Sequence, residues 1–269
     1  MGSQAEKLKQ FRALHAKGAL LLLPNSWDAA SARATQEAGA KAIATSSAAV
    51  AWCHGYKDGE GMPLEVVLTA TREVMHAVGL PVTVDSEAGY SADPASVAAH
   101  VMTLIDLGVA GINIEDGTDK PELLVAKIKA IKAAARAKNA DIFINARADV
   151  YLKNLVPDDA KLAELIRRGN LYRGAGADGF FAPALHDLNE IKDVIGAVDL
   201  PLNILLMRMT PPIPAMKEAG VRRVSVGASL GRAAYGLTMR ATKMLLDEGK
   251  PDAIHAASGD SPEFNKLFG

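Results

Sequence analysis

Three acidic residues stand at the ends of two apolar, strand-like runs. Asp85 and Glu87 follow the apolar residues of PVTVDSEAGY, and Glu115 ends the run in VAGINIEDG. Residues i and i+2 of a strand point to the same side, so Asp85 and Glu87 can face one centre that Glu115 reaches from a neighbouring strand. A hard cation such as Mg²⁺ takes oxygen ligands and keeps several waters. The spacing predicts a shared metal site at these three residues; the alternative is strand-end acids that only face water.

The composition limits the class of protein. The chain has 269 residues, of which 49% are apolar, and α/β barrels use this length for one domain. A net charge of −1 gives no field that would attract nucleic acid or an anionic membrane. The single Cys53 excludes an intrachain disulfide, the start MGSQAEKLKQF is too charged for a secretory signal, and ALLLLP is too short to cross a bilayer. We expect a cytoplasmic protein that binds a small molecule, with no nucleic acid or membrane partner.

Short β-rich runs alternate with amphipathic segments along the chain. The runs FINA and GFFAP are almost continuously apolar, as in strands buried on both faces of a parallel sheet. The predicted strands are Ala19–Pro24, Lys41–Ser46, Pro81–Asp85, Ala110–Glu115, Asp141–Arg147, Asp178–Pro183, Pro201–Met207 and Arg223–Gly227. The helices between them begin at Ser26 as N-cap, at Pro63 and at Asp93, and glycines such as Gly39 and Gly108 end them.

Eight such βα units predict a single-domain α/β protein with a (β/α)8 TIM-barrel fold over residues 1–269. The barrel core covers about 19–246, and 247–269 form a C-terminal tail. A doubly wound open sheet is the alternative, but it normally has fewer strands and a glycine-rich phosphate turn after the first, where this chain has PNSWD. In a barrel the active site lies at the C-terminal ends of the strands. Those ends carry Asn25, Ser26, Thr45, Ser46, Ser47, Asp85, Glu87, Glu115, Asp116, Asn145, Arg147 and Asn203.

At these residues the chain resembles a known superfamily. The segments PNSWDAASARATQEAGAKAIATSSAAVAWCHGYKDGE, VDSEAGY, GINIEDG and INARAD occur in the order typical of the isocitrate lyase and phosphoenolpyruvate mutase superfamily. The resemblance extends from about Pro24 to the segment Ser225–Arg232. It implies a TIM barrel that binds Mg²⁺, with Mn²⁺ as the alternative cation, and a 2-oxo or 2-hydroxy carboxylate, with an enolate formed as a C–C or P–C bond breaks.

The resemblance also assigns roles to individual residues. Asp85 would be the direct metal ligand, and Glu87, Glu115 and Asp58 would hold the water shell of the cation. The superfamily usually has Asp where Glu87 stands. Arg147 would clamp carboxylate and negative charge, or would instead pair with Asp149 or Glu115. The predicted set is metal ligands Asp85, Glu87 and Glu115, substrate-binding residues Ser46, Ser47, Ala48, Asp85, Arg147 and Asn203, and catalytic residues Arg147, Asp58 and Glu115.

The departures from the superfamily pattern narrow the reaction. Its lyases carry a gating loop with a catalytic cysteine after the fourth strand, whereas here IEDGTDKPELLVAKIKA runs directly into a helix. Cys53 falls in the loop after the second strand, where we expect a packing residue. Pro183 stands near the position of the histidine that the phosphonate enzymes use, and Lys120 is either a relic of their loop lysine or a surface lysine. His54 and Tyr56 are further candidates for the substrate side.

Loss of CO₂ or of an acyl group from a metal-chelated 2-oxo acid needs Lewis acidity more than a thiol. We therefore expect a carbon–carbon lyase of the oxaloacetate decarboxylase type. Acyl–carbon hydrolysis of a 3-substituted oxaloacetate, phosphonopyruvate or phosphoenolpyruvate mutase-type P–C chemistry, and 2-oxo acid binding without turnover remain alternatives. The helix Ser229–Leu246 resembles the last barrel helix of the superfamily, which is commonly exchanged between subunits, so the resemblance implies a homodimer or homotetramer.

Overall fold

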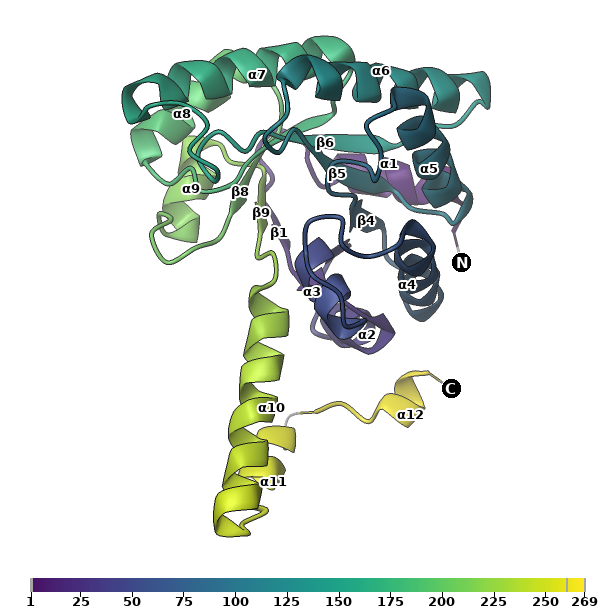
Figure 1. The fold of residues 1–269 in the computed structure, drawn as a ribbon, viewed down its shortest axis with the longest axis vertical. Helices are drawn as coiled ribbons and strands as arrows, with labels where there is room; N and C mark the ends of the chain where they lie inside the picture. Colours follow the sequence, from purple (N-terminus) through teal and green to yellow (C-terminus); the bar gives the residue numbers. More distant parts are fainter. Residues whose placement is uncertain (1, 260, 269) are drawn as a thin grey trace.

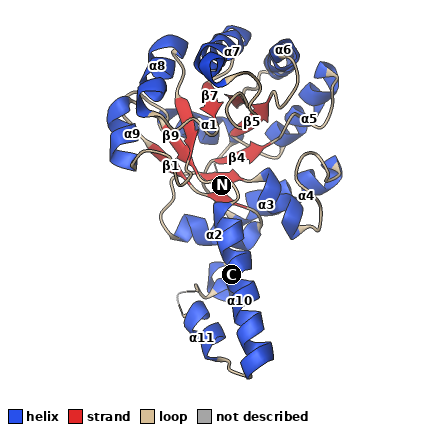
Figure 2. Cartoon of the chain, turned by 60° about the vertical axis from the view of Figure 1, so that its left-hand side comes forward, coloured by secondary structure: helices blue, strands red, loops and turns tan. Residues whose placement is uncertain are grey.

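The strands close into a parallel barrel. The computed structural model describes residues 2–259 and 261–268, and its nine strands follow the order β1-β9-β8-β7-β6-β5-β4-β3-β2. The strands β1 (Leu21–Leu23) and β2 (Asn25–Ser26) are two halves of one run, interrupted at Pro24. The first half pairs with β9 (Arg223–Ser225) and the second with β3 (Ile43–Thr45), so the two edges of the sheet meet. Figure 2 shows the strands enclosed by helices, which confirms the TIM-barrel prediction.

The remaining strands lie inside the predicted runs. They are β4 (Val82–Asp85), β5 (Gly111–Glu115), β6 (Phe143–Arg147), β7 (Gly179–Ala182) and β8 (Leu202–Leu205). Their apolar side chains form one core with the inner faces of the surrounding helices. Burial on both faces explains why most positions of these runs are apolar; the buried polar exceptions are Thr83, Asn113, Asn145 and Asn203.

Helices cover the outside of the barrel (Figure 2). They are α2 (Ala29–Glu37), α3 (Ser47–Cys53), α4 (Leu64–Ala77), α5 (Pro94–Asp106), α6 (Pro121–Ala137), η1 (Asp158–Ala160), α7 (Lys161–Ala175), α8 (Leu188–Val198) and α9 (Ile213–Ala219). Asp93 caps α5 as predicted, since its side chain accepts a hydrogen bond from the Ser96 N–H at 2.9 Å. The prediction of Ser26 as an N-cap was wrong, because Ser26 is still paired in the sheet, and Asp28 caps α2 through the Ser31 N–H at 2.6 Å.

An N-terminal helix that the sequence analysis did not predict closes the end of the barrel where the strands begin. Helix α1 (Gln4–Ala13) begins at a capping box formed by Ser3 and Glu6. Its Phe11 is fully buried and packs edge-on against Phe143 of β6, with ring centroids 5.3 Å apart. His15 follows the helix and stacks on Phe143 at 4.4 Å. The barrel is therefore plugged by aromatic side chains at the end opposite the strand C-termini.

The buried His15 should make the fold sensitive to acid. Burial, with a smaller contribution from Arg223, lowers the pKa of His15 to about 3. A base whose folded pKa is depressed stabilises the fold above its unfolded pKa, and this contribution is lost as the pH falls from about 6.5 towards 3. At pH 4.5 the loss is roughly 2–3 kcal/mol. Urea unfolding at pH 7.5 and 4.5 should show His15→Leu losing less stability than the wild type by about this amount; equal losses would contradict it.

The C-terminal helices extend away from the barrel. Helix α10 (Ser229–Glu248) projects from it and carries α11 (Asp252–Ser258) beside it, with α12 (Phe264–Leu267) near the end of the chain (Figure 1). The predicted last helix is thus confirmed. Exposed apolar side chains lie along α10, among them Met239 at 74% and Leu246 at 78% exposure. Across residues 2–259 and 261–268, no helix has both the length and the apolarity to cross a membrane. Helix exchange between subunits stays a prediction.

Candidate active site

The strand ends bring the predicted charged residues to one mouth of the barrel. Asp85 ends β4, Glu115 ends β5 and Arg147 ends β6. In the sheet register, Glu115 pairs with Arg147, whereas Asp85 pairs with Asn113, two residues before Glu115, so the three residues end adjacent strands at the same edge of the barrel. This is the end of a TIM barrel where active sites lie.

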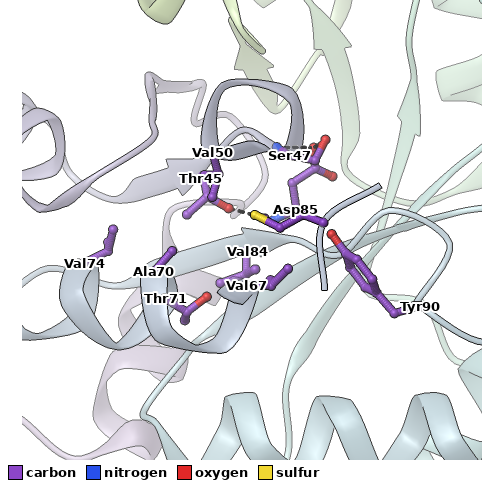
Figure 3. Close-up of a pocket in the computed structure, with 11 residues that line it drawn as sticks. Thr45, Ser47, Val50, Val67, Ala70, Thr71, Val74, Val84, Asp85 and Tyr90 are labelled. Atoms are coloured by element: carbon purple, nitrogen blue, oxygen red, sulfur yellow. Dashed lines mark hydrogen bonds between the residues drawn. The ribbon is translucent and has the colours of Figure 1, made fainter. Parts of the chain in front are cut away.

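One carboxylate oxygen of Asp85 is hydrogen-bonded within the protein, and the other is not. Its Oδ2 accepts hydrogen bonds from the Ser47 N–H at 3.2 Å and from the Ser47 hydroxyl at 2.9 Å, and its backbone N–H donates to Thr45 Oγ1 at 2.9 Å (Figure 3). Its Oδ1 is buried and has no hydrogen-bond partner among the described residues. A buried acceptor without a partner costs about 1–3 kcal/mol. A cation with oxygen ligands would satisfy this atom, so Asp85 fits the predicted role of direct metal ligand.

Glu87 lies in a strained turn beyond Asp85. Glu87 and Tyr90 are non-glycine residues with φ values of 47° and 60°, a conformation that costs energy and often occurs at functional sites. Between them Gly89 has a φ of 101°, and a Cβ there would come within 2.8 Å of Val97, so only glycine fits. The Glu87 carboxylate accepts hydrogen bonds from the Tyr90 hydroxyl at 2.6 Å and from the Glu60 N–H. Burial raises the pKa of Glu87, and Asp85 and Asp58 add to the rise against these two hydrogen bonds.

The loop after α3 reaches this turn through Glu60, a residue that the sequence analysis did not select. Besides its N–H contact with Glu87, its Oε1 accepts the Tyr90 N–H at 2.6 Å. The predicted loop residue Asp58 is exposed, and its charge contributes to the raised pKa of Glu87. His54 and Tyr56 of the same loop are also exposed. A single acidic residue in a polar loop carries no sequence signal that separates Glu60 from Asp58.

Arg147 is held by carboxylates on two sides. Its Nε and Nη2 donate to the two oxygens of Asp149, at 2.6 and 3.0 Å, and its Nη1 lies 2.6 Å from Glu115 Oε2. Burial alone would lower the pKa of Arg147, and these carboxylates more than offset it, so the pKa is raised. Burial raises the pKa of Glu115 to about 8, in spite of Arg147. All three guanidinium nitrogens therefore contact a carboxylate, which is the pairing with Asp149 and Glu115 that the sequence left open.

A second layer of side chains fixes Asp149. Its backbone N–H donates to Asp116 Oδ1 at 2.9 Å, and the Asp149 side chain is fully buried. Asp116 Oδ2 accepts from Arg168 Nη1 at 2.7 Å and from the Tyr172 hydroxyl. Both donors come from α7, so this helix anchors the segment that carries Arg147 and Asp149.

The three predicted metal ligands do not converge as a closed cage. In the part of the chain that the structure describes, no group of three or more His, Cys, Asp or Glu side chains is placed to hold a metal ion. The reason is that Glu87 is turned towards Tyr90 and Glu60, while Glu115 is paired with Arg147. The predicted shared metal site of three acids is therefore not preformed, and the roles of Asp85 as direct ligand and of Glu87 and Glu115 as ligands of the cation's water stay a prediction.

The predicted substrate-binding residues occupy different depths. Ser46 is the N-cap of α3, with its Oγ accepting the Ala49 N–H at 3.4 Å, so the expected turn Ser46–Ser47–Ala48 is the start of a short helix. Asn203 is fully buried inside the barrel, where its Oδ1 accepts from Asn145 and its Nδ2 donates to Ser225 Oγ. Because both ends of its amide are bonded below the mouth, Asn203 is not carried into the proposed binding set.

Cys53 lies at the end of α3 rather than in the predicted loop. It is exposed, and partial desolvation raises the pKa of its thiol, as does Asp28, whereas the neighbouring Tyr235 of α10 lowers it. Among the residues that the structure describes, Cys53 makes no hydrogen bond or ion pair with Asp85, Glu115 or Arg147. Lys120 precedes α6 and is exposed.

The expected packing role is not what the structure shows, since Cys53 is exposed at the end of α3. We predict that Cys53→Ser leaves kcat within about threefold of the wild type, a change below 1 kcal/mol, because this exposed thiol contacts none of the described charged residues of the site. Steady-state turnover with the physiological substrate would check this. A loss of about a hundredfold would instead indicate that this cysteine acts as an acid or base.

Comparison with known proteins agrees with this geometry. The family model described as phosphoenolpyruvate phosphomutase matches residues 11–246. The chain belongs to the phosphoenolpyruvate phosphomutase family. It is similar to an uncharacterized Mycobacterium tuberculosis protein, with 35% identity over 81% of each chain. It is also similar to 2-methylisocitrate lyase of Escherichia coli K12, with 31% identity over 76% of this chain and 71% of the lyase.

The crystal structure of a Burkholderia cenocepacia J2315 protein, provisionally named a phosphonomutase, has 36% identity to this chain and a TM-score of 0.83. The match covers 92% of this chain and 100% of that protein. The family assignment confirms the predicted superfamily. The superfamily includes carbon–carbon lyases and mutases. This member of the phosphoenolpyruvate phosphomutase family is therefore an enzyme of that general kind.

Proposed function

We propose that this protein is a Mg²⁺-dependent lyase that acts on a small 2-oxo or 2-hydroxy carboxylate through an enolate, with oxaloacetate decarboxylation as the best-supported reaction. The observation that carries the proposal is the buried, unpartnered Oδ1 of Asp85, which lies at the mouth where Glu115 and Arg147 also end their strands. A small anionic substrate chelated to a cation would complete the bonding of this atom and balance the acidic cluster.

Each residue has a distinct task in this proposal. Asp85, with Glu87 and Glu115 behind it, would hold Mg²⁺ or Mn²⁺, which supplies a Lewis acid that draws electrons from the reacting carbonyl. The hydroxyl and N–H groups at Ser46, Ser47 and Ala48 would bind the substrate carboxylate. Arg147, held in one orientation by Asp149, keeps a cation beside the oxygen that gains negative charge.

The short connection after β5 favours decarboxylation over the other reactions of the superfamily. Only the segment 116–120 separates β5 from α6, and it contains no cysteine that could serve as acid or base. Phosphoenolpyruvate or phosphonopyruvate chemistry is the second candidate, supported by the family model. Against it, Pro183 follows β7 where the phosphonate enzymes are expected to have a histidine.

The enolate can be tested without knowing which bond breaks. We expect the wild type with Mg²⁺ to catalyse exchange of the C3 hydrogens of pyruvate in D₂O, observed by proton NMR, and to lose this exchange when Mg²⁺ is chelated. A protein that binds 2-oxo acids without turnover would bind pyruvate and show only the exchange rate of free Mg²⁺. Exchange at the free rate in the presence of bound pyruvate would therefore contradict the proposed enzyme.

We further propose that the working form is a homodimer or homotetramer. The exposed apolar residues of α10, such as Leu237, Leu245 and Leu246, support this, because a helix with such a surface usually packs against another chain. Sedimentation at micromolar concentration would test it.

A further inference from the structure

Lys153 places an ammonium group at the barrel mouth, in a position that the sequence analysis did not select. It follows β6 in a turn in which its backbone N–H donates to the Asp149 carbonyl at 2.9 Å. Its Nζ lies 3.4 Å from Asp149 Oδ2 and 3.9 Å from Glu115 Oε1, and the side chain is 37% exposed. The group is therefore beside the acids that hold Arg147 and is still open to solvent.

The Lys153 ammonium makes only long ion pairs with Asp149 and Glu115, at 3.4 and 3.9 Å. No hydrogen bond of its Nζ occurs within residues 2–259 and 261–268. Lys132, by contrast, contacts Asp178 at 2.7 Å, and Lys127 donates to the Ala88 carbonyl at 2.7 Å. The acidic cluster attracts the Lys153 ammonium but leaves its N–H groups free to bind a ligand.

The backbone opposite Lys153 makes room for it. Gly117 follows β5 with a φ of 56°, and a Cβ at this position would come within 3.3 Å of the Lys153 Nζ. The segment after β5 thus allows the ammonium to approach the end of that strand. The two strand ends that carry Glu115 and Arg147 meet at this point.

We propose that Lys153 binds the distal carboxylate of the substrate, so that the enzyme prefers 2-oxo dicarboxylates to monocarboxylates. This inference rests on the proposed function, which assigns the first carboxylate to the Ser46–Ala48 segment and the 2-oxo oxygen to the metal. Arg147 cannot take a further carboxylate along its Nε–Nη2 edge, because Asp149 already occupies that edge. A second carboxylate needs a cation with free donors, and Lys153 provides one at the solvent side of the same mouth.

Malate and lactate test this, because they share a 2-hydroxy carboxylate and differ in the distal carboxylate. Oxalate serves as a third probe that reports only on the metal and the inner binding groups. With Mg²⁺ present, isothermal titration should show that the wild type binds malate more tightly than lactate. Lys153→Met should weaken malate about tenfold or more and leave lactate and oxalate within about twofold, and Lys153→Arg should recover part of the malate affinity.

Lys129→Met is the matched control, since it removes the same charge from the exposed face of α6 and should leave all three affinities unchanged. Equal losses for malate, lactate and oxalate in Lys153→Met would mean that the lysine only balances the acidic cluster, and this would overturn the inference. Unchanged malate binding, or a wild type that does not prefer malate to lactate, would also overturn it. Failure of the wild type to bind oxalate with Mg²⁺ would instead contradict the proposed function itself, and the inference with it.

Discussion

Asp85→Ala is expected to abolish Mg²⁺-dependent binding of oxalate, with a loss of at least about a hundredfold in affinity. Mg²⁺ gives up its water reluctantly, so a site without its direct carboxylate ligand becomes too weak to hold it. The substitution also removes the acceptor for the Ser47 N–H and hydroxyl, which contact Asp85 Oδ2 at 3.2 and 2.9 Å. Isothermal titration with oxalate, with and without Mg²⁺, measures the effect directly.

Asp85→Asn removes the negative charge of Asp85 but keeps the size of the side chain. It keeps an oxygen that can accept from Ser47 and should preserve the fold, yet we expect it to lose most of the metal-dependent affinity as well. If either variant bound oxalate as tightly as the wild type, or if the wild type bound it equally well without Mg²⁺, the assignment of Asp85 as the metal ligand would be wrong.

Arg147→Lys should lower kcat/KM at least roughly tenfold, or about 1.4 kcal/mol. Lysine keeps the charge but cannot donate side by side to both oxygens of Asp149, as Arg147 does at 2.6 and 3.0 Å. Asp149 is fully buried, so weakening its partner also destabilises the fold. We therefore expect a lower melting temperature together with the loss of activity.

The affinity for metal-bound oxalate distinguishes two roles of Arg147. If the arginine contacts the substrate, Arg147→Lys should weaken oxalate at saturating Mg²⁺ even at temperatures where the variant is folded. A lower melting temperature or metal affinity, with unchanged oxalate binding at saturating metal, would show that Arg147 only neutralises Glu115 and Asp149.

The sequence predicted the barrel well because its strands are buried on both faces. Runs such as Gly179–Ala182 are apolar at successive positions, a pattern that does not depend on knowing which strands are neighbours. The plug of the barrel was missed, since helix α1 contains mostly polar residues and only Leu8 and Phe11 among its apolar side chains are buried. The capping box formed by Ser3 and Glu6 was the one local signal for it.

The sequence predicted which charged residues end the strands, and it predicted the paths of the loops between them less well. Asp85, Glu115 and Arg147 are placed by the barrel itself, so the prediction that they meet followed from strand order. Glu60 and Lys153 reach the mouth along loops, whose paths depend on tertiary contacts such as the Glu60 N–H bond to Glu87. For Asn203, the position near a strand end did not reveal that its amide is hydrogen-bonded to Asn145 and Ser225 inside the barrel.

The most direct test of the proposed chemistry is the rate of oxaloacetate loss at a fixed Mg²⁺ concentration, because free Mg²⁺ alone supplies the background reaction. We predict that the wild type accelerates pyruvate formation well above this background and that Asp85→Ala returns the rate to it. A wild-type rate equal to that of free Mg²⁺, measured at protein concentrations where oxalate binds, would contradict the account of this protein as an oxaloacetate decarboxylase.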